Sequence, residues 1–425
     1  MLRALPLRIA ALLLLPLVAG CSGSRPAAPA VPLPAGLSPS EQKLWTTSAY
    51  EVERLQRSGL VNADPALTAY VQEVGMRLVP ERLNVPATFR FHVVMDPDAN
   101  AFALPDGNIY VHLGLLARVQ REDQLAQVLG HEVRHVTGRH SAVKYDQARG
   151  IAGATQVLSV AAAIGFGAMG GGGVQFWGGV SQLGLALTAS AAINGHGRAA
   201  EEDSDLYAVQ AMDAEGYDLC AATELFELLL AEHGQASAAT TFFYGSHPQL
   251  TKRMAYTRER AEHLHGGDLA CEPAPRDSVY LARTAGVRAA QVELWVRSER
   301  FDRALEAADR ALAVDSTDAY LRFWRAEALR LGPEDAASRQ QAEDDYWRAT
   351  ELDTTYAAPY RGIGLLAEED GDAEAAIDAY DYYLYLDPEA KDRRYIQHRI
   401  ATLRGAGSDA VETESTETNE STDGE

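Results

Sequence analysis

The sequence predicts an α+β fold class: a mainly helical N-terminal domain with a small β-sheet, followed by an all-α solenoid of helical repeats. Two short segments, "FRFHVVMD" and "NIYVHLGLL", alternate or begin as strands, whereas "DPALTAYVQEVGMRLV" and "EDQLAQVLGHEVRHV" have the periodicity of amphipathic helices. In the last third, three helical segments end at Asp315, Asp353 and Asp387, at intervals of 38 and 34 residues. The chain is long enough, at 425 residues, for two or three such units.

The first 20 residues have the pattern of a secretory signal peptide, with two arginines, an apolar stretch and small residues before Cys21. "LVAGC" resembles a bacterial lipobox, which predicts that Cys21 carries a lipid and begins the mature protein; a plain cleaved signal is the alternative. Ser22 then indicates sorting to the outer membrane. Residues 21–40 continue as a Pro-rich tether. The net charge of −22 argues against a nucleic-acid partner.

Residues 41–268 are expected to form one mixed domain. Within it, the segment 150–197 contains no Asp, Glu, Lys or Arg, and 13 of its 48 residues are Gly. Gly and Ala dominate it, so we expect a buried or lipid-skimming helical hairpin rather than a transmembrane span. Cys220 and Cys271 can form one disulfide in an oxidising compartment, but two buried thiols fit the sequence nearly as well.

Residues 277–404 have the spacing of tetratricopeptide repeats, whose period is 34 residues. The final unit places small, aromatic and terminating residues where the repeat requires them, and Ala304 and Ala342 occupy the position of Ala376. An ordinary helical domain with coincident spacing is the alternative. Stacked repeats form a curved surface that binds other polypeptides. The acidic segment 405–425 is expected to be disordered. In the final repeat unit, the small, aromatic and terminating positions are occupied by Gly364, Ala376, Tyr380 and Pro388.

The stretch "HEVRH" carries the chemistry. His131 and His135 are four residues apart, so on a helix both rings project from one face and can bind one metal ion. Glu132 can reach a water on that metal without binding it, as the general base of a peptidase. A catalytic zinc needs a third protein ligand. Glu201 and Asp205 are again four residues apart. Glu201 is the candidate for the third ligand, and Asp205 is the candidate for hydrogen-bonding a ligand histidine. The alternative is that both belong to an ordinary solvated acidic helix start.

Several separated motifs between residues 50 and 265 resemble the gluzincin zinc metallopeptidases of family M48, which include the HtpX, CAAX-prenyl-endopeptidase and BepA-like enzymes. "NAFALPDGNIYVHLGLL" is similar to the strand-loop-strand that borders their substrate cleft, which implies substrate binding by Asn100, Ala101 and Phe102. "RAAEEDSD" resembles the element that supplies the third zinc ligand, Glu201, and the supporting acid, Asp205. The implied fold is a mainly helical zincin domain with a small β-sheet, holding one Zn²⁺ per chain.

"SHPQLTKRM" resembles a later family element that lies near the catalytic centre. It implies catalytic roles for His247 and Arg253: one steadies the reacting carbonyl, or His247 closes the metal site in a resting state.

The sequence departs from the family pattern at three positions. Arg134 stands where a small residue is usual, which puts the packing behind the zinc helix in question. Asp203 and Ser204 replace Glu-Ala, a change expected to lie away from the metal. Glu202 is an alternative ligand if the helix register differs. His140 matches the family but lies nine residues from His131, so we expect it to hydrogen-bond rather than to bind the metal.

A lipoprotein signal, this peptidase domain and the repeats together resemble the layout of the BepA-like proteases. The resemblance implies a lipid-anchored zinc metalloendopeptidase on the inner leaflet of the outer membrane, facing the periplasm. It would hydrolyse misfolded or stalled envelope polypeptides, and its repeats would bind outer-membrane assembly components. The alternative is a non-catalytic chaperone or assembly scaffold that acts through the repeats and keeps a closed or structural zinc site.

Overall fold

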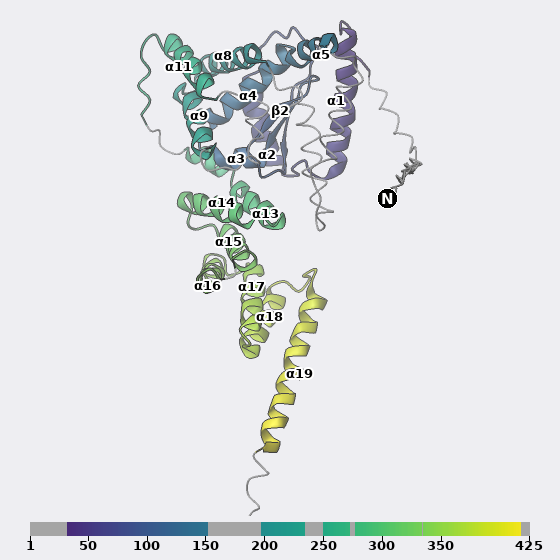
Figure 1. Ribbon diagram of the computed structural model, residues 1–425, viewed down its shortest axis with the longest axis vertical. Coiled ribbons are helices and arrows are strands. Elements are labelled where there is room, and N and C mark those ends of the chain that lie inside the picture. The colour runs from purple at the N-terminus through teal and green to yellow at the C-terminus, as the bar shows by residue number, and fades with distance from the viewer. Residues whose placement is uncertain (1–31, 152–196, 234–249, 273–276, 334, 418–425) are drawn as a thin grey trace, which may run out of the picture.

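The computed structural model describes residues 32–151, 197–233, 250–272, 277–333 and 335–417 (Figure 1). Three predicted features lie outside these ranges: the lipidated Cys21, His247, and all but the ends of the 150–197 segment. Among the helices that can be described, none is both long enough and apolar enough to cross a membrane.

The N-terminal part consists of helices around a small sheet, and the predicted helices and strands are present close to their expected positions. In chain order the elements are α1 (Pro39–Ser58), α2 (Pro65–Arg77), β1 (Arg90–Val94), β2 (Ala101–Ala103), β3 (Asn108–His112), α3 (Leu113–Arg118), α4 (Glu122–Thr137), α5 (His140–Ile151), α8 (Arg198–Glu215), α9 (Cys220–His233), α11 (Leu250–His265) and α12 (Ser278–Arg283).

The sheet has the order β1-β3-β2, with β1 parallel and β2 antiparallel to the central β3. Successive side chains of a strand point to opposite faces. Ile109 and Val111 therefore enter the main core with α2 and α4, while Tyr110 packs on Phe102 in a smaller cluster that also contains Leu55 of α1. Every residue of β3 is buried. The sheet is thus covered on both faces, and β2 is left as an edge strand beside α4.

Helix α8 approaches the middle of α4 closely because Gly130 leaves room for it. A Cβ atom at Gly130 would lie 3.1 Å from the Cα atom and 3.2 Å from the Cβ atom of Ala208. Gly130 immediately precedes His131, and Ala208 is two turns after Glu201. The absence of a side chain at Gly130 therefore brings the two helices that carry the predicted ligands together.

Two links tie the end of this domain to its core. Cys220 and Cys271 form a disulfide, with Cα atoms 5.5 Å apart, which resolves the alternative that the sequence left open. Beyond it, the fully buried Tyr280 of α12 donates a hydrogen bond to the backbone oxygen of Leu116, 2.7 Å away. Val287 and Leu294 also belong to the main core. The region after residue 277 is therefore packed on the peptidase-like part rather than joined to it by a free linker.

The C-terminal part is a stack of helices, each packed on the next, with α13 also contacting α15 and α15 contacting α17. Ala304, Ala342 and Ala376, predicted to be equivalent, are all fully buried. Gly364 packs on the Tyr380 ring, where a Cβ atom would come within 2.5 Å. The helices are α13 (Val287–Arg297), α14 (Phe301–Val314), α15 (Ala319–Leu331), α16 (Ala336–Leu352), α17 (Ala358–Glu369), α18 (Ala373–Leu386) and α19 (Arg393–Glu417).

Helix α19 differs from the expectation for the chain end. The segment 405–425 was expected to be disordered throughout, but α19 continues to Glu417. Its first half is anchored by the buried Ile396 and Ile400. Since adding residues to an existing helix costs far less than nucleating one, the anchored half can extend into the acidic segment.

Candidate metal centre

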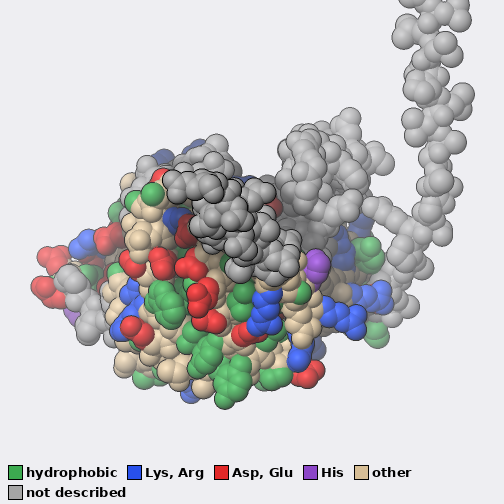
Figure 2. Space-filling view, turned by 90° about the horizontal axis from the view of Figure 1, so that it is seen from below, with side chains coloured by type: hydrophobic (Ala, Val, Ile, Leu, Met, Phe, Trp, Pro, Cys, Tyr) green, Lys and Arg blue, Asp and Glu red, His purple; other side chains and the backbone are tan. Residues whose placement is uncertain are grey.

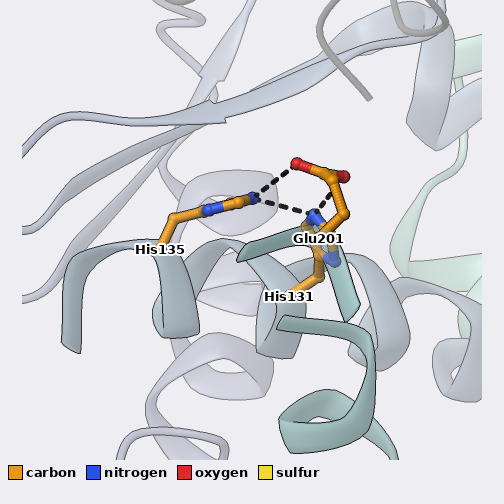
Figure 3. A group of neighbouring side chains, drawn as sticks. All are labelled: His131, His135 and Glu201. Atoms are coloured by element: carbon orange, nitrogen blue, oxygen red, sulfur yellow. Dashed lines mark hydrogen bonds and ion pairs between the residues drawn. The ribbon is translucent and has the colours of Figure 1, made fainter. Parts of the chain in front are cut away.

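Helix α4 presents two histidines to one point. His131 and His135 lie one helical turn apart and are both almost fully buried, with their Nε2 atoms 3.0 Å from each other (Figure 3). This is the arrangement expected for side chains four residues apart on a helix. Both rings turn their Nε2 atoms toward the neighbouring helix α8.

Helix α8 completes the group with Glu201. One carboxylate oxygen lies 3.6 Å from His131 Nε2 and the other 3.5 Å from His135 Nε2. Within the described residues, these three form the single group of His, Cys, Asp or Glu donors close enough to hold a metal ion. A tetrahedral ion with bonds of about 2.0–2.1 Å requires ligand atoms about 3.3 Å apart, so the donor types and separations fit zinc. Glu202, the alternative ligand, is exposed to solvent.

Glu132 lies in the same helical turn as the two histidines and is 1% exposed. A carboxylate buried in this way, beside a set of metal ligands, has the position required of a general base that takes a proton from a bound water.

Asp205 holds the His131 ring from behind. Its Oδ1 atom lies 2.7 Å from His131 Nδ1, while Arg253 of α11 and Tyr256 donate further hydrogen bonds to the same carboxylate. Burial alone would raise the pKa of Asp205, but the charges of Arg253 and His131 outweigh it and hold that pKa well below its usual value. Asp205 therefore stays ionised and fixes the His131 tautomer that leaves Nε2 free for a metal.

Arg253 contacts two of the predicted site residues. It pairs with both oxygens of Asp205 at 2.7 Å and lies 3.1 Å from Glu201, and it is 3% exposed. The guanidinium thus sits behind the metal ligands. Attraction to Asp205 and Glu201 more than offsets the effect of burial and raises the pKa of Arg253 above its usual value.

The ring of His135 is held by a different set of residues. Its Nδ1 atom lies 3.0 Å from Nδ1 of His140, and His140 Nε2 lies 3.1 Å from Asp203. Arg134 pairs with Asp203 through two hydrogen bonds of 2.6 and 3.0 Å. His140 therefore hydrogen-bonds, as the sequence predicts. Asp203 contacts none of the three predicted ligands itself, but it is linked to His135 through His140.

Ser204, the other half of that departure, also lies at the site. It is fully buried, and its hydroxyl is 3.4 Å from the Nδ1 atoms of both His135 and His140. No spacing in the sequence indicates these contacts, because they depend on how closely α8 approaches α4.

The predicted substrate-binding residues lie along β2 and just before it. The side chains of Asn100, Ala101 and Phe102 are all buried. Any contact of this segment with a substrate would therefore come from the backbone of the edge strand β2. The sequence did not point to the pocket beside it, which is lined by His135, Val136, Ala103, Leu104 and Trp45 among others.

Comparison with known proteins agrees with this geometry. Residues 65–261 match peptidase family M48. A beta-barrel assembly-enhancing protease of Escherichia coli (strain K12) is 30% identical over 221 residues, which are 51% of this chain and 43% of that protein. A putative beta-barrel assembly-enhancing protease of Vibrio cholerae serotype O1 is 30% identical over 275 residues, covering 61% of this chain and 53% of that protein.

A mitochondrial metalloendopeptidase, OMA1 of Schizosaccharomyces pombe, is 31% identical over 196 residues, which are 45% of this chain and 52% of that protein. The chain thus spans about half the length of the relatives it matches. The matched region contains the buried cluster of His131, His135 and Glu201. Residues 65–261 are therefore a region that matches peptidase family M48.

Proposed function

We propose that this protein is a zinc-dependent metalloendopeptidase that hydrolyses peptide bonds of misfolded or stalled cell-envelope proteins. The observation that carries the proposal is the convergence of His131, His135 and Glu201, with Glu132 buried in the same helical turn. Bound zinc would supply a Lewis acid and an activated water. Glu132 accepts the proton of that water, and Asp205 keeps His131 in the tautomer that can bind the metal.

The roles of the two later residues can be separated. Arg253 holds Asp205 and Glu201 in place, because its guanidinium is engaged with both carboxylates. That engagement favours a supporting role for Arg253 over a direct contact with the reacting carbonyl. His247, which lies outside the described residues, remains the candidate for steadying the carbonyl or for closing the metal site at rest.

The substrate would be an extended polypeptide. Edge strands pair readily with another chain through their backbone groups, and β2 is the edge strand nearest α4. The pocket at His135, with its apolar wall of Trp45, Val136 and Leu104, would take a substrate side chain. A site of this kind cuts polypeptide segments that are locally unfolded, since a folded domain does not offer a free strand.

The envelope location rests on three observations. The N-terminal pattern predicts a lipid on Cys21, which would anchor the chain to the inner leaflet of the outer membrane, facing the periplasm. The Cys220–Cys271 disulfide fits an oxidising compartment. The names of the bacterial relatives place those proteins in β-barrel assembly.

The C-terminal helices, which we interpret as tetratricopeptide repeats, carry a surface suited to binding polypeptides. Four aromatic rings form a continuous stripe from α16 to α18, with successive centroids 6.4, 4.5 and 5.8 Å apart. Tyr385, at one end, is 74% exposed. Exposed aromatic stripes of this kind favour protein binding. We propose that the aromatic stripe of this protein binds client polypeptides or outer-membrane assembly components. The stripe consists of Trp347, Tyr360, Tyr382 and Tyr385.

Figure 2, a view from the repeat end of the molecule, shows hydrophobic and acidic side chains side by side on the exposed face. A partner bound to this face would therefore meet both apolar and negatively charged side chains.

The aromatic stripe also supports a second candidate function, a non-catalytic scaffold with a closed or structural zinc site. The two functions differ in which substitutions matter in cells. If Trp347→Ser with Tyr385→Ser abolishes the cellular role while Glu132→Gln has no effect, the scaffold explains the protein better. The peptidase predicts that Glu132→Gln abolishes it.

The experiment that tests the peptidase is Glu132→Gln in the purified zinc-loaded chain. Removing the general base is expected to lower cleavage of an unfolded polypeptide by about 100-fold or more, without loss of zinc, because Glu132 is not a metal ligand. Zinc content by mass spectrometry and cleavage by gel are measured on the same sample. Glu202→Gln, a change of the same type at an exposed position, serves as control and should retain full activity. Undiminished cleavage by Glu132→Gln would refute the assigned role.

A further inference from the structure

The two ligand histidines of the metal centre are supported in different ways. His131 meets a carboxylate directly, through Asp205 at 2.7 Å. The Nδ1 atom of His135 lies 3.0 Å from the ring of His140, which in turn reaches Asp203. Asp203 and Asp205 are two residues apart on α8, so the same helix supplies the acid for both ligands.

The hydrogen-bond directions along this second path are fixed by the metal. If His135 binds zinc through Nε2, its Nδ1 atom carries a proton and donates it to Nδ1 of His140. His140 must then carry its own proton on Nε2, where the carboxylate of Asp203 accepts it at 3.1 Å. Arg134 donates two hydrogen bonds to Asp203 and holds that carboxylate in place. Each donor along the path therefore faces an acceptor.

We propose that Arg134, Asp203 and His140 form a hydrogen-bonded relay that positions His135 and fixes its tautomer for zinc binding. The relay rests on the proposed zinc site and deepens it by assigning these three residues as positioning residues for one ligand. Partners of this kind, one step removed from the metal, typically contribute 10- to 100-fold to metal affinity. Arg134 and Asp203 are two of the three departures from the family pattern noted in the sequence, and here they pair with each other.

A simpler explanation is that Arg134 and Asp203 form a structural ion pair between α4 and α8. Their side chains are 31% and 41% exposed, a setting in which an ion pair contributes little to stability. The two explanations differ in what they require. A structural pair needs only opposite charges, whereas the relay needs an acceptor opposite His140 Nε2.

The test measures zinc affinity by chelator competition in the full chain, so that its readout does not depend on catalysis. Asp203→Ala is expected to weaken zinc binding by about 10-fold, because His140 loses the acceptor that fixes its tautomer. Arg134→Ala, one bond further away, should have a smaller effect in the same direction. Glu202→Ala is the matched control: it removes a carboxylate next to Asp203 on the exposed face of the same helix, and should stay within about twofold of wild type.

The decisive variant exchanges the two charges, Arg134→Asp with Asp203→Arg. It restores the ion pair but places a donor opposite His140 Nε2, which forces the His140 proton onto Nδ1, against the donor of His135. We expect this variant to recover the thermal stability of wild type while its zinc affinity stays about 10-fold reduced. Wild-type zinc affinity in the exchanged variant, or in Asp203→Ala, would overturn the relay while leaving the peptidase intact. A wild-type chain that takes up no zinc would overturn both.

Discussion

Asp205 is the buried carboxylate that joins several side chains at the metal centre. It accepts hydrogen bonds from His131, Arg253 and Tyr256, and it is fully buried. Removing one partner from a buried charge network leaves the others without compensation, which is far more costly than losing an exposed ion pair. A single carboxylate therefore links the metal ligand on α4 to the helix α11.

Substituting Asp205 by Asn should destabilise the zinc-free chain by about 3 kcal/mol at neutral pH, because Arg253 loses a buried counter-charge. The folded-state pKa of Asp205 is lowered, so its contribution is present above the unfolded pKa of about 4 and is lost as the pH falls further. The difference in the free energy of unfolding between wild type and Asp205→Asn should thus become smaller below about pH 4. Urea unfolding at several pH values measures this.

Tyr256→Phe is the companion variant for that measurement. It removes one hydrogen bond to Asp205 but keeps the charges, so it should cost only about 1 kcal/mol and show no such narrowing with pH. Equal losses for the two variants would contradict the importance given to the charge.

At the scale of the elements, the geometry of the metal centre depends on how closely helices α4 and α8 approach each other. Gly130 faces Ala208 where α4 and α8 cross, and this contact sets the position of Glu201 relative to the two histidines. In an isolated helix, alanine would be favoured over glycine by about 0.5–1 kcal/mol. A glycine at this position is therefore best explained by the space it leaves.

Gly130→Ala is expected to lower stability by about 1–3 kcal/mol in spite of the better helix propensity, since the added methyl group must push α8 away. The same shift moves Glu201, so zinc affinity should fall as well. Calorimetry and chelator competition measure the two effects. Gly267→Ala, at an exposed position after α11 where no described atom lies within 4 Å, is the control and should change neither. Unchanged zinc affinity in Gly130→Ala would show that α8 tolerates a wider spacing.

Much of this arrangement could be predicted from the sequence, wherever a local pattern carries the information. Helical periodicity gave α2 and α4, alternation gave β1, and the four-residue spacing gave both histidines. The third ligand came from resemblance, because nothing local distinguishes Glu201 from an ordinary acidic helix start.

The contacts that join distant segments could not be predicted. Arg134 and Asp203 are 69 residues apart, and their pairing follows from the packing of α4 on α8. The disulfide between Cys220 and Cys271 likewise depends on a Cα separation that sequence spacing does not give. In each case, the sequence does not indicate how closely two distant segments pack against each other.

At the scale of the whole molecule, the first two helices after residue 277, α12 and α13, contribute to the core of the N-terminal domain. Tyr280, Val287 and Leu294 are buried in it, so the predicted domain boundary cuts through packed side chains. Burying each such side chain contributes about 1.5–3 kcal/mol. A deletion of residues 277–404 would therefore damage the peptidase as well as remove the repeats.

We expect a chain that ends at residue 276 to melt about 10 °C or more below the full-length protein, because these three side chains are lost. A chain that ends at Thr317 retains α12, α13 and α14 and should keep the melting temperature of the peptidase part within a few degrees. Calorimetry of the two truncated chains decides this. Similar melting temperatures would show that the shared core is not needed for stability.

For the client binding proposed above, the hydrogen bond from Tyr280 to Leu116 and the buried side chains around it would have a consequence. Because α12 and α13 pack into the core that also contains α4, packed helices rather than a free linker join the proposed client-binding stripe to the proposed metal centre. A client held on the stripe can be cut only if enough of its chain is unfolded to reach from one to the other. The packed junction would then select clients by the length of their unfolded segment. Nearly folded clients would escape cleavage, and stalled clients with long free segments would be cut.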